Sequence, residues 1–345
     1  MTEVIKNDNF LRACRKEKTD FTPVWLMRQA GRYLPEYMEI KNKSSFIEMC
    51  KTPEVACEIT LQPLRRFDLD ASIIFADILL PLEGMGINFE FTKGDGPVIH
   101  NPVRNRADID AIKPITPEED VDYLLEAIKL TKKELYGKIP LIGFCGAPFT
   151  LASYMIEGGG SKNYLHAKKL MYTDPESWDV MMTKITDILI GYLKAQINVG
   201  VNAVQIFDSW AGCLSPNDYK QYALPYTKRL IKEVSGTVPV INFSTNTATY
   251  LDIVKEAGGD VVGLDWKVNL IDGWNQLGDV AVQGNMDPAV LFSDEKTIRA
   301  KAKEVIDSAG GRQGHIFNLG HGIILGTPPE NVKILVDAVH EFSTK

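Results

Sequence analysis

The feature that most limits the fold of this chain is a series of short apolar runs, each followed by a longer stretch with helical periodicity. Eight of these runs are short and rich in β-branched residues, as expected for buried strands. They cover residues 23–27, 71–75, 140–144, 203–207, 239–243, 261–265, 281–285 and 315–319. The longer stretches predict helices at residues 53–67, 117–135, 175–199, 216–234, 247–257, 269–277, 294–308 and 329–342. Such repeated strand–helix units are typical of an α/β protein with a parallel sheet.

Two α/β architectures fit this pattern, and a closed barrel is the better fit. Eight units in 345 residues predict a single (β/α)8 TIM barrel domain that spans residues 1–345. A doubly wound open sheet is the alternative, but no GxGxxG turn follows the first apolar run. Residues 87–100 alternate between apolar and polar around Lys93-Gly94-Asp95-Gly96, which predicts a β-hairpin inserted after the second strand.

Composition excludes several classes of protein. The formal net charge of -7 argues against a general nucleic-acid binder, which usually carries a basic surface. The five cysteines form no CxxC pair, which indicates a reducing compartment, and the N-terminus has no apolar core of signal-peptide length. The apolar stretch at 71–82 is too short for a membrane span and contains Asp77. We therefore expect a cytoplasmic protein without nucleic-acid or membrane partners.

Polar residues recur where the predicted strands end, which is where a TIM barrel carries its chemistry. The first strand runs into Arg28-Gln29-Ala30-Gly31-Arg32, a pair of guanidinium groups on either side of a glycine hinge. A planar guanidinium suits carboxylates or phosphates, because it can bond two oxygens of an anion at once. Surface ion pairs are the commoner role of arginine, but this position at a strand end favours an anion site. The other strand-end residues are Asp77, Cys145, Asp208, Ser209, Ser244, Asp265, Asn285, Asp287 and His321.

Asp77 is the most unusual of these residues, because it interrupts the apolar stretch IIFADILLPL. An ionised carboxylate there loses its hydration and needs a compensating partner. One interpretation is structural, with a backbone N–H or an arginine as the partner. The other is functional, with the carboxylate facing ligand N–H donors or a positive charge that develops during a reaction.

Tyr154 and His321 are weaker candidates when taken alone. Tyr154 lies in GFCGAPFTLASYMIEGGGS (143–161), and a tyrosine is more often a core residue than a catalytic one. His321 is flanked by glycines in NLGHGI, after the last strand, where an imidazole can donate to a carboxylate. No histidine has a second metal ligand at short spacing, so we expect no metal. A Schiff base on Lys267 has no other support.

Two longer segments resemble those of the uroporphyrinogen decarboxylase family: PVWLMRQAGRYLPEY (23–37) and GFCGAPFTLASYMIEGGGS (143–161). The resemblance covers nearly the whole chain, and it extends to LQPLRRFDLDASIIFADIL (61–79), FDSWAG (207–212), VVGLDW (261–266), VQGNMDP (282–288) and FNLGHGI (317–323). There are two departures. Ser244-Thr245-Asn246-Thr247 stands where many relatives have a glycine-rich turn, and Asp68 stands where relatives often have proline.

The resemblance implies a homodimeric (β/α)8 barrel that uses no metal or organic cofactor. It implies conversion of uroporphyrinogen III, a tetrapyrrole, to coproporphyrinogen III in heme biosynthesis. By the same resemblance, Arg28, Gln29, Ala30, Gly31 and Arg32 form a substrate-binding loop, and Asp77 contacts the central pyrrole N–H groups. Tyr154, Ser209 and His321 match further substrate contacts. The catalytic residues we expect are Asp77, Arg28 and Arg32, with either Arg28 or a water held by an arginine as the proton donor.

Two other functions are compatible with a barrel of this kind. One is a zinc-dependent methyltransferase that acts on corrinoid-bound methyl groups, but it requires a His-x-Cys pair where this chain has Asn242-Phe243-Ser244. The other is a catalytically silent tetrapyrrole carrier, which would bind the substrate without changing its mass.

Overall fold

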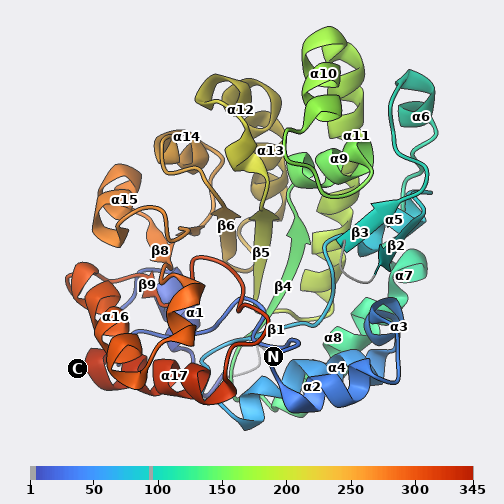
Figure 1. Ribbon diagram of the computed structural model, residues 1–345. Helices are drawn as coiled ribbons and strands as arrows, with labels where there is room; N and C mark the ends of the chain where they lie inside the picture. The colour runs from blue at the N-terminus through green and yellow to red at the C-terminus, as the bar shows by residue number, and fades with distance from the viewer. Residues whose placement is uncertain (1–4, 93–95, 345) are drawn as a thin grey trace.

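A curled parallel sheet of seven strands forms the centre of the computed structural model, which describes residues 5–92 and 96–344. Helices surround this sheet on its outer side, as Figure 1 shows. Within this sheet, each strand pairs in parallel with the sheet strand that follows it in the sequence, which is the order expected from successive strand–helix units. In sheet order the strands are β1 (Ser72–Ile73), β4 (Leu141–Gly146), β5 (Ala203–Asp208), β6 (Val240–Ser244), β7 (Val261–Gly263), β8 (Ala281–Gln283) and β9 (His315–Ile316).

The first predicted strand, residues 23–27, is not a strand of this sheet, although it lies between the sheet's two edges. Val24 forms one parallel bridge with Phe317, the residue directly after β9, and the Val24 carbonyl accepts from the Asp70 N–H at 2.8 Å. The Trp25 N–H donates to the Phe317 carbonyl at 3.4 Å, whereas side chains take up the N–H groups of Val24 and Met27. The Val24 N–H donates to the Asp70 carboxylate at 2.7 Å, and the Met27 N–H donates to the Asn318 amide oxygen at 3.1 Å.

Each predicted helix is present in whole or in part, but the one predicted at 117–135 breaks at Val121. Helices that were not predicted also form, at Asn9–Cys14, Pro35–Lys41, Phe46–Lys51, Leu80–Gly84, Arg106–Asp110, Pro148–Glu157 and Leu165–Thr173. The predicted helix at 216–234 breaks at Ala223, because Pro225 has no N–H to continue the first helix. The segment after β4 forms a helix that is buried on nearly every side, so its sequence has no amphipathic period. The helices are α1 (Asn9–Cys14), α2 (Pro35–Lys41), α3 (Phe46–Lys51), α4 (Pro53–Leu61), η1 (Pro63–Arg65), α5 (Leu80–Gly84), α6 (Arg106–Asp110), α7 (Pro117–Asp120), α8 (Asp122–Leu135), α9 (Pro148–Glu157), α10 (Leu165–Thr173), α11 (Pro175–Asn198), η2 (Ala211–Cys213), α12 (Pro216–Tyr222), α13 (Leu224–Val234), α14 (Leu251–Glu256), α15 (Leu270–Leu277), η3 (Pro288–Phe292), α16 (Glu295–Ser308) and α17 (Pro329–Ser343).

A two-stranded antiparallel sheet lies after the β1 segment, where a hairpin is expected. It consists of β2 (Phe89–Thr92) and β3 (Gly96–Ile99), with Phe89 paired to Ile99. Residues 93–95, which carry most of the predicted turn, lie outside the described residues. The three consecutive glycines at 158–160 pack on this two-stranded sheet. Gly159 forms a bridge with Val98, and the Gly158 carbonyl accepts from the Ile99 N–H at 2.8 Å.

The apolar core has two layers, as expected for a sheet that curls round on itself. The larger layer fills the space between the sheet and the helices. The smaller layer lies inside the curl and takes side chains from Trp25 and from successive strands, among them Ile142, Ile241, Val261 and Ile316. Helix α1 closes the amino-terminal end of this inner layer with Phe10, Leu11, Ala13 and Cys14.

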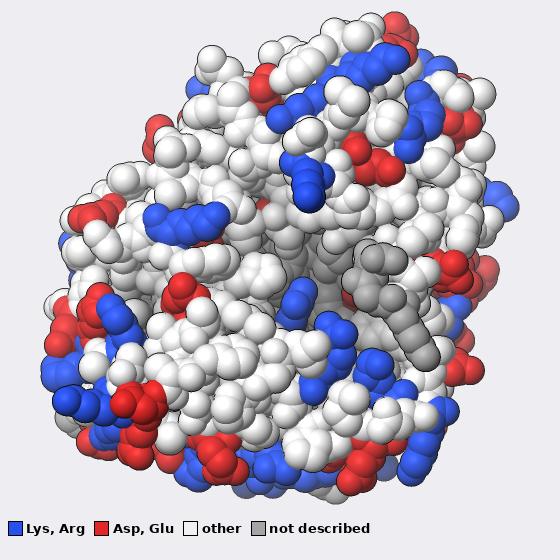
Figure 2. Space-filling model, viewed as in Figure 1, with Lys and Arg blue, Asp and Glu red and all other residues white. Residues whose placement is uncertain are grey.

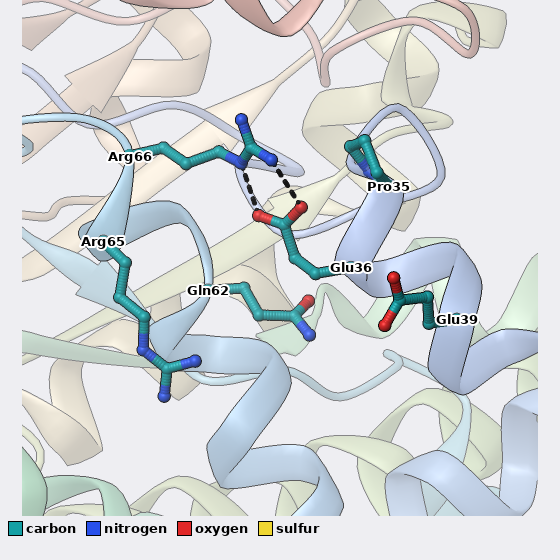
Figure 3. Close-up of a pocket in the computed structure, with 6 residues that line it drawn as sticks. All are labelled: Pro35, Glu36, Glu39, Gln62, Arg65 and Arg66. Atoms are coloured by element: carbon teal, nitrogen blue, oxygen red, sulfur yellow. Dashed lines mark hydrogen bonds and ion pairs between the residues drawn. The ribbon is translucent and has the colours of Figure 1, made fainter.

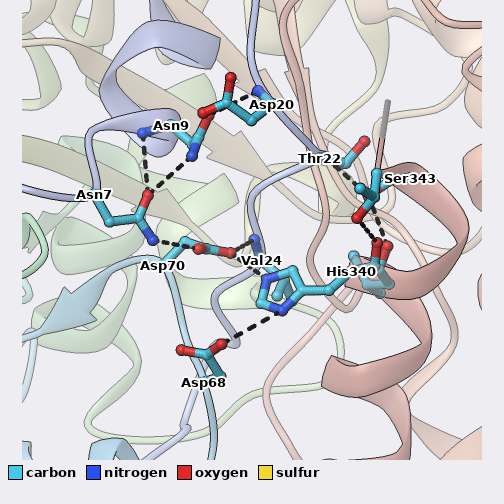
Figure 4. Close-up of polar contacts among 11 residues, drawn as sticks. Asn7, Asn9, Asp20, Thr22, Val24, Asp68, Asp70, His340 and Ser343 are labelled. Atoms are coloured by element: carbon cyan, nitrogen blue, oxygen red, sulfur yellow. Dashed lines mark hydrogen bonds and ion pairs between the residues drawn. The ribbon is translucent and has the colours of Figure 1, made fainter.

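A buried polar network at the amino-terminal ends of the strands connects both ends of the chain to β1 (Figure 4). Asp70 is only 1% exposed, and its carboxylate accepts from the Val24 N–H, from the Asn7 amide at 2.7 Å and from the His340 ring at 2.8 Å. Ser343 accepts from the Thr22 N–H at 2.9 Å. Helix α17 and the segment before β1 are therefore joined by a partly buried hydrogen bond between His340 and Asp70.

Among the residues that the structure describes, none of the helices has both the length and the apolar character needed to span a bilayer.

Candidate active site

The carboxyl ends of the parallel strands meet at one rim of the curled sheet, and the candidate site lies there. Figure 2 shows a hollow near the centre of this view, over the ends of β4 and β5, with Lys and Arg side chains beside it. We refer below to this rim, with the loops that follow β1, β5, β7 and β9, as the mouth.

The loop at 28–32 has its two arginines at the surface, and the side chain of Gln29 between them anchors the loop to the core. Arg28 and Arg32 are exposed, and Arg28 adopts the left-handed backbone conformation with φ +62°. A non-glycine residue in that conformation requires support from its surroundings. Gln29 supplies that support, since its buried side chain accepts from the Leu26 N–H at 3.1 Å and donates to the Ala71 carbonyl at 3.3 Å. The Gln29 side chain thus supports the loop from below.

Asp77 lies partly buried in the loop after β1, close to Arg28. One of its carboxylate oxygens accepts from the Leu79 N–H at 2.9 Å. Burial raises the pKa of Asp77 to about 6, although the Leu79 hydrogen bond and the Arg28 charge both act to lower it. The carboxylate is therefore ionised at neutral pH and available to a ligand.

Tyr154 projects from α9 toward the same two charged groups. Burial raises the pKa of Tyr154 to about 12, the Asp77 charge adds to this effect, and the Arg28 charge opposes it. Its ring lies against the indole of Trp210, with ring centroids 3.8 Å apart and planes at 32°. Trp210 also contacts Tyr164 edge-on, with centroids 5.0 Å apart. An aromatic wall beside Asp77 and Arg28 follows from these contacts.

His321 lies close to Arg28. Its ring contacts Trp266 edge-on, with centroids 6.2 Å apart. Burial lowers the pKa of His321, and the Arg28 charge lowers it further, while Asp265 acts in the opposite direction. The imidazole is therefore neutral at pH 7 and can both donate and accept a hydrogen bond.

The glycines around His321 are required by close packing. A Cβ atom on Gly322 would lie 2.4 Å from Cδ of Arg28, and one on Gly320 would lie 2.3 Å from the Trp266 nitrogen. Both distances are far below a van der Waals contact. Gly322 is thus what allows the Arg28 side chain to pass across the last loop of the mouth.

Ser209 follows β5 and is anchored by its backbone, since its carbonyl accepts from the Thr245 hydroxyl at 2.6 Å. Its neighbour Asp208 is buried and accepts from the Thr150 hydroxyl at 2.7 Å. Burial raises the pKa of Asp208 to about 7, and the Thr150 hydrogen bond lowers it. The Thr150 oxygen also accepts from the Trp210 N–H at 3.3 Å. Asp208 and Thr150 therefore stabilise the loop that carries Ser209 and Trp210.

The remaining strand-end candidates have structural roles. Cys145 is fully buried in the outer core, and Ser244 hydrogen-bonds to Thr247 at 2.7 Å. Asn285 donates to the carbonyls of Asp265 and Val268 at 2.7 Å each, and Asp287 caps η3 through the Ala289 N–H.

The cavities elsewhere on the molecule do not compete with the mouth. One of about 420 Å³ lies between α2 and η1, far from the strand ends, and Figure 3 shows its lining. Its two arginines are already paired: Arg66 forms a two-point ion pair with Glu36, and Arg65 forms one with Glu58. The two guanidinium groups of this cavity are therefore already neutralised by carboxylates and do not offer a free cation to an anionic ligand. A second cavity of about 390 Å³ lies at the opposite, amino-terminal end of β9.

A zinc-dependent methyltransferase would need metal ligands at residues 242–244. This chain has a hydrogen-bonded amide, Asn242, at the first of these positions. Asn242 is buried, and its amide group donates to the Val254 carbonyl at 3.2 Å and to the Gly258 carbonyl at 3.4 Å. Within residues 5–92 and 96–344, no three His, Cys, Asp or Glu side chains gather closely enough to hold a metal ion.

Sequence reasoning missed the two tryptophans of the mouth. Trp210 and Trp266 each directly follow a strand-end residue that was singled out, Ser209 and Asp265. The available signal was their position within three residues of a strand end, where loops carry function. Neither Trp210 nor Trp266 is fully buried, and Trp266 is 37% exposed.

Comparisons with known proteins give one consistent result. Residues 5–342 match the family model described as Uroporphyrinogen decarboxylase (URO-D). A relative from Carboxydothermus hydrogenoformans, named uroporphyrinogen decarboxylase, is 59% identical over 340 residues, which are 98% of this chain and 97% of the relative. One of the same name from Sorangium cellulosum is 53% identical over 338 residues, 97% of each chain. Among solved structures, a methyltransferase from Methanosarcina mazei has a TM-score of 0.84 at 20% identity and covers 99% of both chains, which shows a shared fold.

Proposed function

We propose that this chain, which belongs to the uroporphyrinogen decarboxylase family, removes carbon dioxide from the four acetate side chains of uroporphyrinogen III and so makes coproporphyrinogen III. It is then a carboxy-lyase of heme and tetrapyrrole biosynthesis that works without a cofactor. The observation that carries the proposal is the position of Asp77, a partly buried carboxylate in electrostatic contact with Arg28 at the mouth. A reduced tetrapyrrole presents N–H groups at its centre and carboxylates at its edge, which match these two groups.

The reaction needs a place for the electrons that the departing carboxylate leaves behind. If a pyrrole carbon is first protonated, the ring becomes cationic. Breaking the bond to carbon dioxide then sends the electron pair into the ring and gives a neutral exocyclic methylene. Protonation of this methylene and loss of the extra ring proton give the methyl-substituted pyrrole. The substrate is thus its own electron sink.

Asp77 supports this reaction by stabilising the cationic ring more than the neutral one. Its carboxylate accepts hydrogen bonds from the central pyrrole N–H groups, and in the partly buried mouth its charge is only weakly screened. Such differential stabilisation lowers the barrier instead of merely tightening binding. Arg28, Arg32 and His321 bind the peripheral carboxylates, together with Ser209 and Tyr154, while Gln29, Ala30 and Gly31 shape the loop that carries both arginines.

The pH dependence of the reaction follows from the raised pKa of Asp77. This carboxyl is protonated below a pH of about 6 and then can no longer stabilise positive charge. We expect kcat/KM to fall about tenfold per pH unit below that value. A pH–rate profile of the free enzyme measures this limb. A flat profile down to pH 4.5, with folding intact, would contradict the role of Asp77.

The glycine beneath Arg28 provides a second test of the site. Gly322→Ala places a methyl group against Cγ and Cδ of Arg28 and must displace that side chain. We expect kcat/KM to fall about 10- to 100-fold, because displacement of a binding group by about 1 Å is costly. Gly191→Ala on α11, where the added methyl meets no atom within 4 Å, is the matched control and should keep full activity. Equal activity of the two variants would show that Arg28 needs no such packing.

The proposal extends to the fold and assembly of the enzyme. We propose that residues 23–27 close the sheet as its eighth segment, so that residues 1–345 form one (β/α)8 barrel with a hairpin insertion after the second strand. The backbone contacts of Val24 on one side to Phe317 and on the other to Asp70 support this closure. We propose further that the enzyme is a cytoplasmic homodimer.

One assay tests the function directly. The purified protein is incubated anaerobically with chemically reduced uroporphyrin, and the carboxylates on the oxidised products are counted. Stepwise loss from eight to four carboxylates is the expected result. Unchanged substrate mass with tight binding would instead indicate a tetrapyrrole carrier.

A further inference from the structure

A lysine follows β7 at the mouth, in a place to which neither the family motifs nor the mechanism assigns a role. Lys267 donates through its ammonium group to the amide oxygen of Asn246, in the loop after β6. The same nitrogen lies 5.7 Å from the centroid of the Trp266 ring. Trp266 in turn contacts His321 edge-on at 6.2 Å. The lysine therefore belongs to the same rim as His321 and Arg28.

The backbone around Lys267 is held in place by buried groups. The Asp265 carboxylate accepts from the Lys267 N–H at 2.9 Å and from the Asn246 N–H at 2.5 Å. Asn285 fixes the same strand end by donating to the Asp265 carbonyl at 2.7 Å. The backbone of Lys267 is thus fixed. Movement of its ammonium group comes mainly from rotation about the bonds of its four-carbon side chain.

The partners of Lys267 leave its charge uncompensated. Within the part of the chain that the structure describes, its ammonium meets an amide oxygen and an indole ring but forms no ion pair with a carboxylate. Other surface lysines have such a pair, for example Lys303 with Asp307 at 2.7 Å and Lys333 with Asp337 at 2.6 Å. An amide oxygen is easily exchanged for a carboxylate oxygen, because the charge-assisted bond is stronger.

The charge of the proposed substrate calls for such a group. Each of the four pyrrole rings of uroporphyrinogen carries an acetate and a propionate, so the molecule arrives as a polyanion. The mouth offers the guanidinium groups of Arg28 and Arg32, while His321 is neutral at pH 7. These two guanidinium groups alone do not pair with so many carboxylates.

We propose that Lys267 is a further substrate-binding residue, whose ammonium exchanges Asn246 for a carboxylate of the tetrapyrrole on the β7 side of the mouth. This inference rests on the proposed function and adds a contact to it. The competing explanation is structural: Lys267 and Asn246 join the loops after β6 and β7 and never touch the substrate.

The experiment separates charge from structure with four variants in the anaerobic assay. Lys267→Met removes the charge and keeps the length of the side chain, and Lys267→Arg restores the charge. Asn246→Ala removes the tether and leaves the lysine. Lys333→Met on α17 is the matched control, an exposed lysine far from the mouth.

We expect Lys267→Met to raise KM for uroporphyrinogen about 5- to 20-fold with kcat within about twofold, because a charge-assisted contact is lost in ground state and transition state alike. Lys267→Arg should restore KM to within about threefold, while Asn246→Ala and Lys333→Met should resemble the unaltered chain. The KM of Lys267→Met should also rise less with added salt. If Lys267→Met did not fold, Lys267→Gln, which retains an amide donor for Asn246, would serve in its place.

Three results would overturn the proposal: an unchanged KM in Lys267→Met, an equal shift in Asn246→Ala, or no rescue by arginine. In each case the unaltered chain would still form coproporphyrinogen. Failure of the proposed function is different, because the unaltered chain would then form no product at all.

Discussion

Asp77→Asn is expected to lower kcat for uroporphyrinogen decarboxylation by about 10²- to 10³-fold, the usual effect of removing one group that stabilises developing charge. Asparagine has the same size and keeps an oxygen that can accept from the Leu79 N–H, so the loop after β1 should stay in place. What disappears is the negative charge facing the cationic ring. Steady-state rates in the anaerobic assay measure the effect.

The stability of this variant should change in the opposite direction from its activity. Burial raises the pKa of Asp77, so at pH 7 its ionised form is disfavoured in the folded state and lowers the free energy of unfolding. Replacing the charge by an amide should leave the melting temperature unchanged or slightly higher. Near-normal turnover in a folded Asp77→Asn protein would sink the proposed mechanism, whereas loss of turnover together with unfolding would point to a structural carboxylate.

The second large effect concerns stability. Asp70→Ala is expected to lower the free energy of unfolding by about 3–5 kcal/mol, because it breaks a buried ion pair and leaves its partners without an acceptor. The Val24 N–H, the Asn7 amide and the His340 ring all lose their bond to this carboxylate (Figure 4). Chemical denaturation monitored by circular dichroism measures the change.

Asp68→Ala is the matched control for this substitution. Asp68 also faces His340, at 3.9 Å, but its side chain is 88% exposed, so water screens the pair. Its removal should cost at most about 1 kcal/mol. Similar losses in the two variants would mean that the buried network adds little to the fold.

The same network makes stability depend on pH in a defined direction. Burial by itself lowers the pKa of His340, but the hydrogen bond and charge of Asp70 outweigh it, and the pKa is raised above 6.5. The folded state therefore binds the proton more tightly than the unfolded state. The contribution of His340 is fully present below pH 6.5 and disappears as pH rises through the higher folded-state value. The gap in stability between the unaltered protein and His340→Ala should accordingly narrow from pH 6 to pH 9.

Local patterns in the chain were enough to predict most of the architecture. A buried parallel strand is a continuous apolar run, so β4, β5 and β6 are found close to their predicted bounds. The prediction of a strand was wrong for residues 23–27, where Asp70 and Asn318 accept from the backbone N–H groups of Val24 and Met27. Those side chains lie 46 and 291 positions away along the chain, so no local pattern indicates that they replace a strand ladder.

In the candidate site, too, some features could be predicted from the sequence and others could not. Arg28, Asp77 and His321 are recognisable from the sequence as candidates because each follows an apolar run, at the strand ends where a barrel carries its chemistry. Whether such a residue faces the mouth or the core depends on contacts between distant loops, and Asp208 and Cys145 are buried although their positions look equivalent.

By itself the sequence determined the order of the strands, the family and the candidate residues Arg28, Asp77 and His321, because apolar periodicity and motifs are local properties of the chain. Only the tertiary structure decided the ionisation of Asp77, the support of Arg28 by Gly322 and Gln29, and the placement of Lys267 beside Trp266 and Asn246. Desolvation and Coulomb energy depend on distances through space, and folding brings together charges that the sequence keeps far apart.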